Sequence, residues 1–162
     1  EPSRRQRQMC IRDRYRMNLF KTGLLLFGAL VISRLLPLPE NSEPLLGLAV
    51  LTPYITKNNL AFLFPLGVMF VSDLFLGLGS WIFYTYTALA LAPFISRQID
   101  NKYVALGTSW LVWHILANIS APFPPFTPEA LLFDLRLLAS GLSVVVLYDV
   151  CRRLWQTAYR EV

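Results

Sequence analysis

A run of twenty-one residues from Leu60 to Ser80 restricts the possible folds of this chain more than any other feature. It contains no polar side chain before Ser72 and Asp73, and it is apolar again as far as Leu78. At a rise of ~1.5 Å per residue, a helix of this length is as long as the hydrocarbon core of a bilayer is thick. The run therefore predicts a membrane-spanning helix.

Asp73 is the residue of this run whose position needs an explanation. A carboxylate at the centre of a membrane helix costs about 2.5–3.5 kcal/mol to insert, so an acidic residue inside a span is a functional-site hypothesis. The alternative is that Asp73 ends the helix near the membrane surface, close to Gly77, Gly79 and Ser80. The run by itself leaves both interpretations open.

The composition of the whole chain agrees with a membrane protein. The chain has 162 residues, of which 55% are hydrophobic and 15% are charged, whereas soluble domains have roughly 25% charged residues. Its net charge of +5 does not indicate nucleic-acid binding, because six of its fifteen basic residues lie in the first sixteen positions. The others lie between apolar segments, which is typical of membrane topology and not of a basic patch. We expect no nucleic-acid partner.

Residues 1–16 contain no apolar core, so they do not form a secretory signal. The segment MCIRDR at positions 9–14 resembles the translation of the transposase mosaic-end adapter that is used to prepare sequencing libraries. We predict that residues 1–16 are a non-native, disordered leader and that the natural chain begins at Met17. The alternative is a basic arm that binds anionic lipid.

Six apolar segments follow, separated by short polar or proline-rich connections. They cover residues 19–36, 45–55, 60–80, 81–95, 104–121 and 137–151. The second is short, and it predicts a short or broken helix of the kind that lines cavities in transporters. Before the sixth segment, the prolines of residues 122–128 break the chain, and Thr127 begins a predicted separate short helix that ends at Asp134.

The basic residues predict how the segments cross the membrane. After residue 16, the basic residues at alternate connections are Lys21, Lys57, Arg97 with Lys102, and Arg152 with Arg153. Lys and Arg are enriched on the cytoplasmic side, and only Arg34 and Arg136 lie at the outer boundary. The sequence predicts an all-α membrane protein: a six-transmembrane-helix bundle over residues 17–155, with both termini cytoplasmic and a cytoplasmic tail over residues 156–162.

The fifth segment carries polar side chains at helical spacing. Trp110, His114 and Asn118 recur at i, i+4 and i+8, so they share one face. Such residues usually face the bundle interior or a cavity, and the alternative is that they bond helix to helix. Because Asp73, Asn118 and the acidic connection at Glu40–Glu43 all fall on the outer side, we expect an outward-facing pocket for a small-molecule solute.

The predicted ligand-binding residues share this outer location. They are Asp73, Asn118, His114, Trp110, Asn41, Trp81 and Tyr84. In this interpretation Asp73 accepts hydrogen bonds from a polar or cationic solute, Asn118 both donates and accepts, and the tryptophans stack on the solute.

We expect no enzymatic activity, because the sequence lacks a nucleophile elbow, a zinc-binding HExxH motif and a phosphate-cradling glycine loop. It also lacks a Walker motif, so any ATP-driven role needs a partner. Cys10 and Cys151 provide neither metal-ligand spacing nor a disulfide framework. We therefore expect no metal and no cofactor.

Small residues in the first segment predict a close helix–helix contact. Ala29 and Ser33 are four residues apart, and small side chains at this spacing let a second helix approach closely in lipid. That helix belongs either to this chain or to a partner subunit.

Four short motifs together point to one known family: RLLP at residues 34–37, NSEP at 41–44, SDLFLG at 72–77, and Asn118. Through them, residues 31–149 resemble an uncharacterised family of membrane transport proteins. That family is related to the S (substrate-binding) components of energy-coupling factor (ECF) vitamin transporters.

The resemblance implies an S-component-like fold in the bacterial cytoplasmic (inner) membrane and uptake of a small vitamin-like solute. It also implies coupling to an ECF-type transmembrane subunit and ATPases, with Ala29 and Ser33 as the nearest equivalents of the partner interface. Two alternatives remain open. One is a non-transporting membrane scaffold that resembles the rod-shape-determining subunits, and the other is a small membrane enzyme that acts on lipid.

Overall fold

The computed structural model describes residues 21, 23–36, 42–119 and 127–158, and within these ranges it contains helices and no strand. The elements are the first helix (Gly23–Leu35), α2 (Leu45–Ile55), the short 3-10 helix η1 (Asn59–Phe62), α3 (Leu63–Leu76), α4 (Ile82–Arg97), α5 (Lys102–Ile119) and α6 (Pro128–Ala158). The prediction of an all-α chain is confirmed. The predicted second segment, residues 45–55, coincides with α2.

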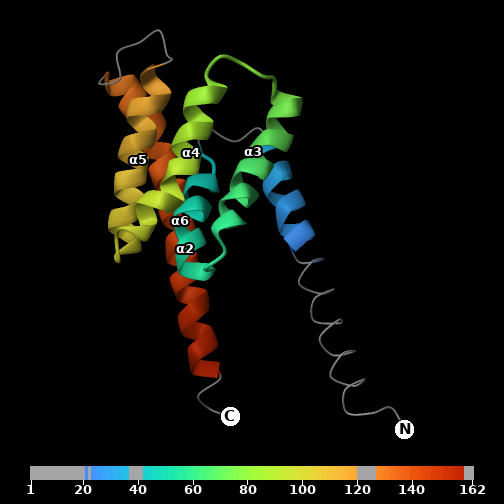
Figure 1. Cartoon of the computed structure of the whole chain (residues 1–162), viewed down its shortest axis with the longest axis vertical. Coiled ribbons are helices and arrows are strands. Elements are labelled where there is room, and N and C mark those ends of the chain that lie inside the picture. The colour runs from blue at the N-terminus through green and yellow to red at the C-terminus, as the bar shows by residue number, and fades with distance from the viewer. Residues whose placement is uncertain (1–20, 22, 37–41, 120–126, 159–162) are drawn as a thin grey trace.

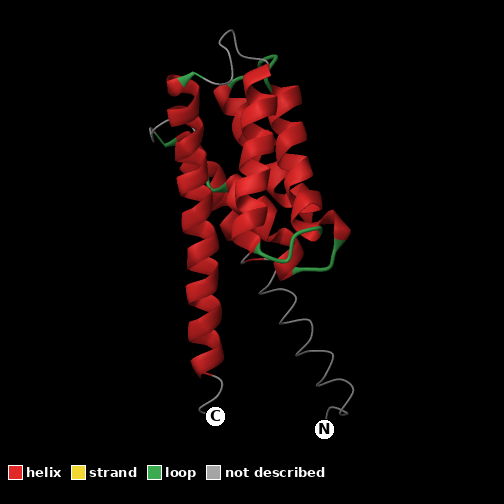
Figure 2. Ribbon diagram, turned by 90° about the vertical axis from the view of Figure 1, so that its left-hand side faces the viewer, coloured by secondary structure: helices red, strands yellow, loops and turns green. Residues whose placement is uncertain are grey.

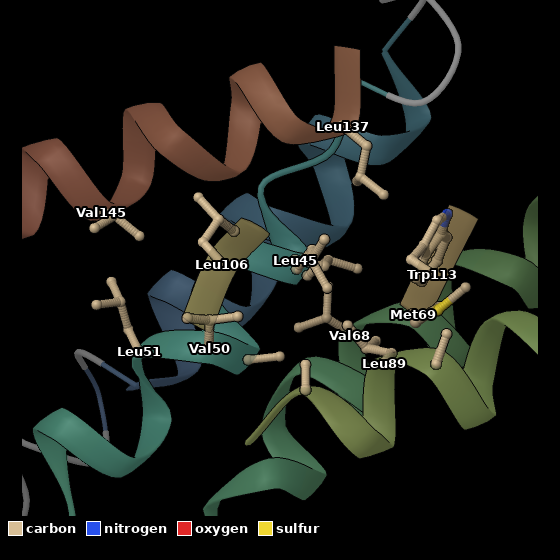
Figure 3. Packing of buried hydrophobic residues seen from close by; sticks show 14 of the residues in the cluster. Leu45, Val50, Leu51, Val68, Met69, Leu89, Leu106, Trp113, Leu137 and Val145 are labelled. Carbon is tan, nitrogen blue, oxygen red and sulfur yellow. The ribbon is translucent and has the colours of Figure 1, made fainter. Parts of the chain in front are cut away.

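The helices run alternately up and down, and α2 lies in the middle of the bundle (Figure 1). It contacts α3, α4, α5 and α6. Its buried side chains include Leu45, Val50 and Leu51, which pack near Leu106 of α5 and Val145 of α6 (Figure 3). A short apolar helix is thus surrounded by the longer ones, because its side chains are apolar on every face.

Two glycines allow α2 and α6 to touch through their backbones. A Cβ atom added to Gly47 would lie 2.7 Å from the carbonyl oxygen of Gly141 and 2.9 Å from its Cα. At these distances no side chain fits between the two helices. The crossing of α2 and α6 therefore depends on glycine at position 47. A Cβ added at Gly141 would meet Gly47 at 3.5 and 3.7 Å, which are ordinary contact distances, and its tight neighbour would be Leu106 Cδ1 of α5 at 3.0 Å.

The first helix packs against α3. Phe27 meets Phe64 edge-to-face, with 5.8 Å between the ring centroids, and also covers Gly67. Val31, one turn further along, is buried. The contact is narrow, and most of the other apolar side chains of the first helix are exposed.

The predicted division into a short helix through Asp134 and a separate last segment from residue 137 is wrong. Residues 128–158 form one continuous helix, because Pro128 occupies its first position, where the missing N–H costs nothing. The helix also continues past residue 155, where the tail was predicted to begin. Figure 2 shows α6 extending well beyond the rest of the bundle at the end where the chain terminates.

Polar contacts join the helices toward the lower end of the bundle in Figure 1. Lys102 Nζ lies 2.7 Å from Asp149 Oδ1, and the Tyr103 hydroxyl donates to Asp149 Oδ2 at 2.7 Å, which joins α5 to α6. The Tyr54 hydroxyl of α2 donates to the carbonyl of Ile99 at 2.5 Å.

One helix in the described residues, Pro128–Thr157, is long and apolar enough to cross a membrane. Gly23–Leu35, Leu45–Ile55 and Leu60–Leu76 are apolar but shorter. The finer arrangement, six spans with both termini cytoplasmic, stays a prediction.

Candidate functional site

Three side chains of α5 bond to a single residue of α6, Asp134. His114 Nδ1 and Asp134 Oδ2 lie 2.6 Å apart, and Asn118 Nδ2 donates to the same oxygen at 2.8 Å. The indole N–H of Trp110 donates to the backbone carbonyl of Asp134 at 2.6 Å. We call Trp110, His114, Asn118 and Asp134 the histidine cluster.

The face predicted from the spacing on α5 is present, and it is turned toward α6. The rings of Trp110 and His114 are stacked, with their centroids 5.7 Å apart and their planes 15° from parallel. The side chains of His114 and Asp134 are each only 3% exposed. An N–H at Nδ1 of His114 satisfies the short contact with the carboxylate and fixes the orientation of the imidazole.

Asp134 itself was not predicted as a site residue, because the sequence predicts it at the end of a short helix before the sixth segment. A signal for it exists in the sequence. Asp134, Leu137, Gly141 and Val145 follow one another at intervals of three or four residues and are all buried. Asp134 therefore lies on the buried face of α6, and extending the helical period backward from Val145 would have found it.

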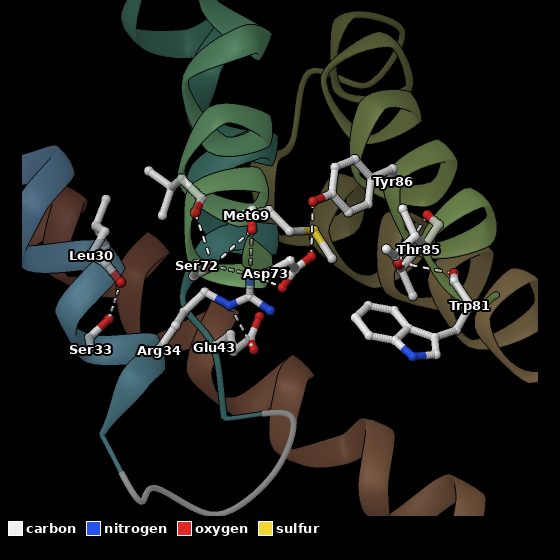
Figure 4. A network of polar contacts seen from close by, with 12 residues as sticks. Leu30, Ser33, Arg34, Glu43, Met69, Ser72, Asp73, Trp81, Thr85 and Tyr86 are labelled. Atoms are coloured by element: carbon white, nitrogen blue, oxygen red, sulfur yellow. Dashed lines mark hydrogen bonds and ion pairs between the residues drawn. The ribbon is translucent and has the colours of Figure 1, made fainter. Parts of the chain in front are cut away.

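A second polar group surrounds Arg34 at the end of the first helix. Its Nε lies 2.9 Å from Glu43 Oε1, just before α2, and its Nη1 lies 3.0 Å from Asp73 Oδ1 on α3 (Figure 4). The Tyr86 hydroxyl of α4 donates to Asp73 Oδ2 at 2.9 Å. Arg34 Nη1 also donates to Ser72 Oγ at 2.5 Å. We call Arg34, Glu43, Ser72, Asp73 and Tyr86 the arginine network.

The members of the arginine network differ in their access to solvent. The side chain of Asp73 is fully buried and that of Arg34 is 5% exposed, whereas that of Glu43 is 25% exposed. Burial raises the pKa of the Glu43 carboxyl above its ordinary value; the charge of Arg34 opposes this increase and the charge of Asp73 adds to it. Asp73 is thus a buried ion-pair partner. Glu43 is the acid of the network that has substantial access to solvent and can exchange a proton with it.

The sequence did not predict this network, although Arg34 provided a hint. It is one of two basic residues at the outer boundary, contrary to the distribution of the others. An arginine in such a place needs an acidic partner, but no spacing rule connects residues 34, 43 and 73.

The residues that were predicted to line a single pocket belong to two different groups. Asp73 belongs to the arginine network, whereas Trp110, His114 and Asn118 belong to the histidine cluster. Asn41 lies outside the described residues.

The two remaining predicted residues lie at the start of α4. Trp81 precedes the helix, its indole covers the backbone of Gly79, and Figure 4 shows it pointing toward the arginine network. Tyr84 packs edge-on against Phe83, with 5.7 Å between the ring centroids. Neither residue contributes a polar contact to the two groups within the described part of the chain.

Both groups lie at the same end of the bundle. Arg34, Asp73 and His114 lie near the C-terminal ends of helices that run toward this end. Tyr86 and Asp134 lie near the N-terminal ends of helices that run away from it. In Figure 1 this is the upper end, opposite the connections that carry Lys57, Arg97 and Lys102.

The two groups offer different chemistry. The histidine cluster combines a donor–acceptor amide, an imidazole–carboxylate pair and an aromatic surface, which suits a small polar organic molecule. The arginine network combines opposite charges in a buried setting. Among the described residues, no group of three or more His, Cys, Asp or Glu side chains is placed to hold a metal ion.

No curated protein and no solved structure matches this sequence. One family model does match, over residues 15–123, which is more than half of the chain and includes the whole arginine network. The resemblance to an uncharacterised family agrees with this match, whereas the relationship to S components remains a prediction. The chain belongs to the family of unknown function DUF6580.

Proposed function

We propose that this chain is an integral membrane solute-binding subunit, similar to an S component, that takes up a small vitamin-like solute across the bacterial inner membrane. The histidine cluster is the observation that carries the proposal. Polar and ionisable groups are costly in a bundle surrounded by lipid, and those that occur there commonly mark a solute or ion pathway. His114 and Asp134 form such a pair, each 3% exposed.

The position of the histidine cluster also supports solute capture from outside. It lies at the end of the bundle opposite the connections rich in Lys and Arg, and the basic end is cytoplasmic by the usual distribution. In the proposed binding step, a donor group of the solute replaces the Asn118 amide at Asp134 Oδ2. The released amide then donates to an acceptor group of the solute.

Energy for uptake would come from partner subunits, namely an ECF-type transmembrane subunit and ATPases. Ala29 of the first helix is exposed, and an added Cβ at Gly28 meets nothing within 4 Å, so another helix has room to approach there. Ser33 is half-buried, and its hydroxyl donates to the carbonyl of Leu30 in its own helix. Ala29 is thus the better candidate for the partner interface.

The test is ligand-dependent thermal stabilisation of the purified full-length chain across vitamins and related metabolites. We expect at least one compound to raise the melting temperature of the wild type, with the increase lost in Asn118→Ala. Tyr103→Phe, at the opposite end of the bundle, serves as the matched control and should keep the increase. Failure of every compound to stabilise the wild type, or equal stabilisation of Asn118→Ala, would contradict the proposal.

The geometry of His114 favours one second candidate, a membrane enzyme that acts on lipid. A carboxylate bonded to Nδ1 of an imidazole is the arrangement that orients a general base, and the distance here is 2.6 Å. His114→Gln distinguishes the two functions, since it removes the base but keeps a polar side chain. Full biological function of that variant would eliminate the enzyme.

A further inference from the structure

The hydrogen bonds of Arg34 leave one buried carboxylate oxygen without a donor. Its Nη1 carries two protons, and these are directed at Ser72 Oγ, 2.5 Å away, and at the backbone carbonyl of Met69, 3.2 Å away. Asp73 Oδ1 lies 3.0 Å from the same nitrogen, but it receives no hydrogen bond from the described part of the chain. The contact of Arg34 with Asp73 Oδ1 is therefore an ion pair only.

The second oxygen of Asp73 is satisfied, because the Tyr86 hydroxyl donates to Oδ2. An unsatisfied acceptor next to it is costly, since the Asp73 side chain is fully buried and water does not reach it. One more donor is therefore needed at Oδ1.

The charges of the arginine network are also unbalanced. Two carboxylates, Glu43 and Asp73, face one guanidinium. The groups that approach from the neighbouring helices are uncharged hydroxyls: Tyr86 on α4, and Ser140 on α6, which donates to the backbone carbonyl of Glu43 at 2.7 Å. With both acids ionised, the network carries one net negative charge in a buried setting, which is unfavourable.

We propose that the arginine network is a proton-binding site, in which Glu43 takes up a proton from the outer solution and shares it with Asp73 Oδ1. Glu43 is suited to this role because it is the member with substantial contact with solvent. The proton supplies the missing donor to Asp73 and brings the net charge of the network to zero. When Glu43 loses the proton to solvent, its carboxylate pairs with Arg34 alone.

Proton binding at this place changes how the helices are joined. Glu43 connects the first helix to α2, while Asp73 connects it to α3 and, through Tyr86, to α4. Protonation weakens the first link, because it removes the charge that attracts Arg34, and strengthens the second. The proton site does not depend on the proposed solute site, which uses different residues.

The pKa of Glu43 shifts in the direction that this proposal requires. Burial raises the pKa of the carboxyl above its ordinary value of 4.5, so the folded chain binds this proton more tightly than the unfolded chain does. The resulting stabilisation is complete below pH 4.5 and is lost as the pH rises through the higher pKa of the folded state.

Infrared difference spectroscopy of the full chain in lipid nanodiscs tests the proposal directly. Lowering the pH toward 4.5 should produce the C=O stretching band of a protonated carboxyl group in the wild type. The band should be lost in Glu43→Gln and retained in Glu129→Gln, which removes an exposed acid at the same end of the bundle. Absence of the band from the wild type, or its full retention in Glu43→Gln, would overturn the proposal.

A second variant covers the case in which Glu43→Gln does not fold. Tyr86→Phe removes the hydroxyl donor to Asp73, so the proton on Glu43 becomes the remaining donor to that carboxylate and the band should appear at higher pH than in the wild type. A band at unchanged pH in Tyr86→Phe would mean that Asp73 does not share the proton.

Discussion

At the scale of single residues, Asp134 holds the histidine cluster together. Its carboxylate bonds to two side chains of α5 and its backbone carbonyl to a third. Because His114 is buried and Asn118 is half-buried, removing the carboxylate leaves donors unsatisfied and does not simply delete a contact.

We predict that Asp134→Leu lowers the free energy of unfolding by about 2–5 kcal/mol, since His114 and the Asn118 amide lose a charged acceptor. The measurement is denaturation of the purified protein in detergent, followed by circular dichroism. Asp149→Leu on the same helix is the control and should have a smaller effect, because its ion pair with Lys102 is partly exposed. Equal losses in the two variants would show that the histidine cluster contributes no more stability than the partly exposed contacts of Asp149.

Tyr86 provides the second prediction at this scale. Tyr86→Phe deletes the hydroxyl that donates to Asp73 Oδ2 at 2.9 Å, and hydrogen bonds to charged groups are worth about 1.5–3 kcal/mol. We expect a loss of stability in this range. Tyr84→Phe, two residues earlier, should change stability little, because its hydroxyl takes no part in the arginine network. Equal melting temperatures of the two variants would contradict a stabilising role for the Tyr86 hydroxyl.

These residues show what spacing can and cannot predict. Trp110, His114 and Asn118 were found because one helix places them on one face, and a helical period is local information. Arg34, Glu43 and Asp73 come from three elements, and their meeting depends on how the first helix packs on α3. No period in the sequence contains that information.

At the scale of elements, the close crossing of α2 and α6 decides how tightly the bundle packs. The backbones of the two helices meet at Gly47 and Gly141, and Gly47 is among the buried residues of α2. A side chain at position 47 has to separate the two helices or be accommodated by strain.

Gly47→Ala should therefore destabilise the fold by about 1–3 kcal/mol, even though alanine has the higher helix propensity. Gly107→Ala is the matched control: an added Cβ there meets nothing within 4 Å, so the better helix propensity should stabilise by about 0.5–1 kcal/mol. Melting temperatures of the two variants provide the test. A stable Gly47→Ala protein would mean that α2 and α6 do not touch.

The sequence predicts elements well where apolar segments end in polar connections. Residues 45–55 match α2 because prolines and polar residues enclose them. The sequence predicts a short helix through Asp134 and a separate last segment from residue 137, and this division is wrong. One helix begins at Pro128, where proline is common, and continues past Asp134 to Ala158, because no helix-breaking residue lies between Asp134 and Leu137.

At the scale of the whole molecule, the distribution of charge and apolar surface predicts how the bundle sits in a bilayer. Large apolar side chains are exposed on every long helix, with Leu25, Phe75 and Phe83 more than 70% exposed. The Lys and Arg residues of the connections gather at the end where α6 terminates. A bilayer would cover the apolar surface and place the basic end in the cytoplasm.

Cys151 makes this orientation testable, because it is exposed and lies near the basic end of α6. In a Cys10→Ser background it is the sole cysteine. A membrane-impermeant maleimide should label it in inverted membrane vesicles and leave it unlabelled in intact spheroplasts. Ser80→Cys, in the connection between α3 and α4 and combined with Cys151→Ser, should give the opposite result, since that connection lies at the other end of the bundle. Labelling of both positions from the same side would contradict the orientation and, with it, capture of a solute from outside.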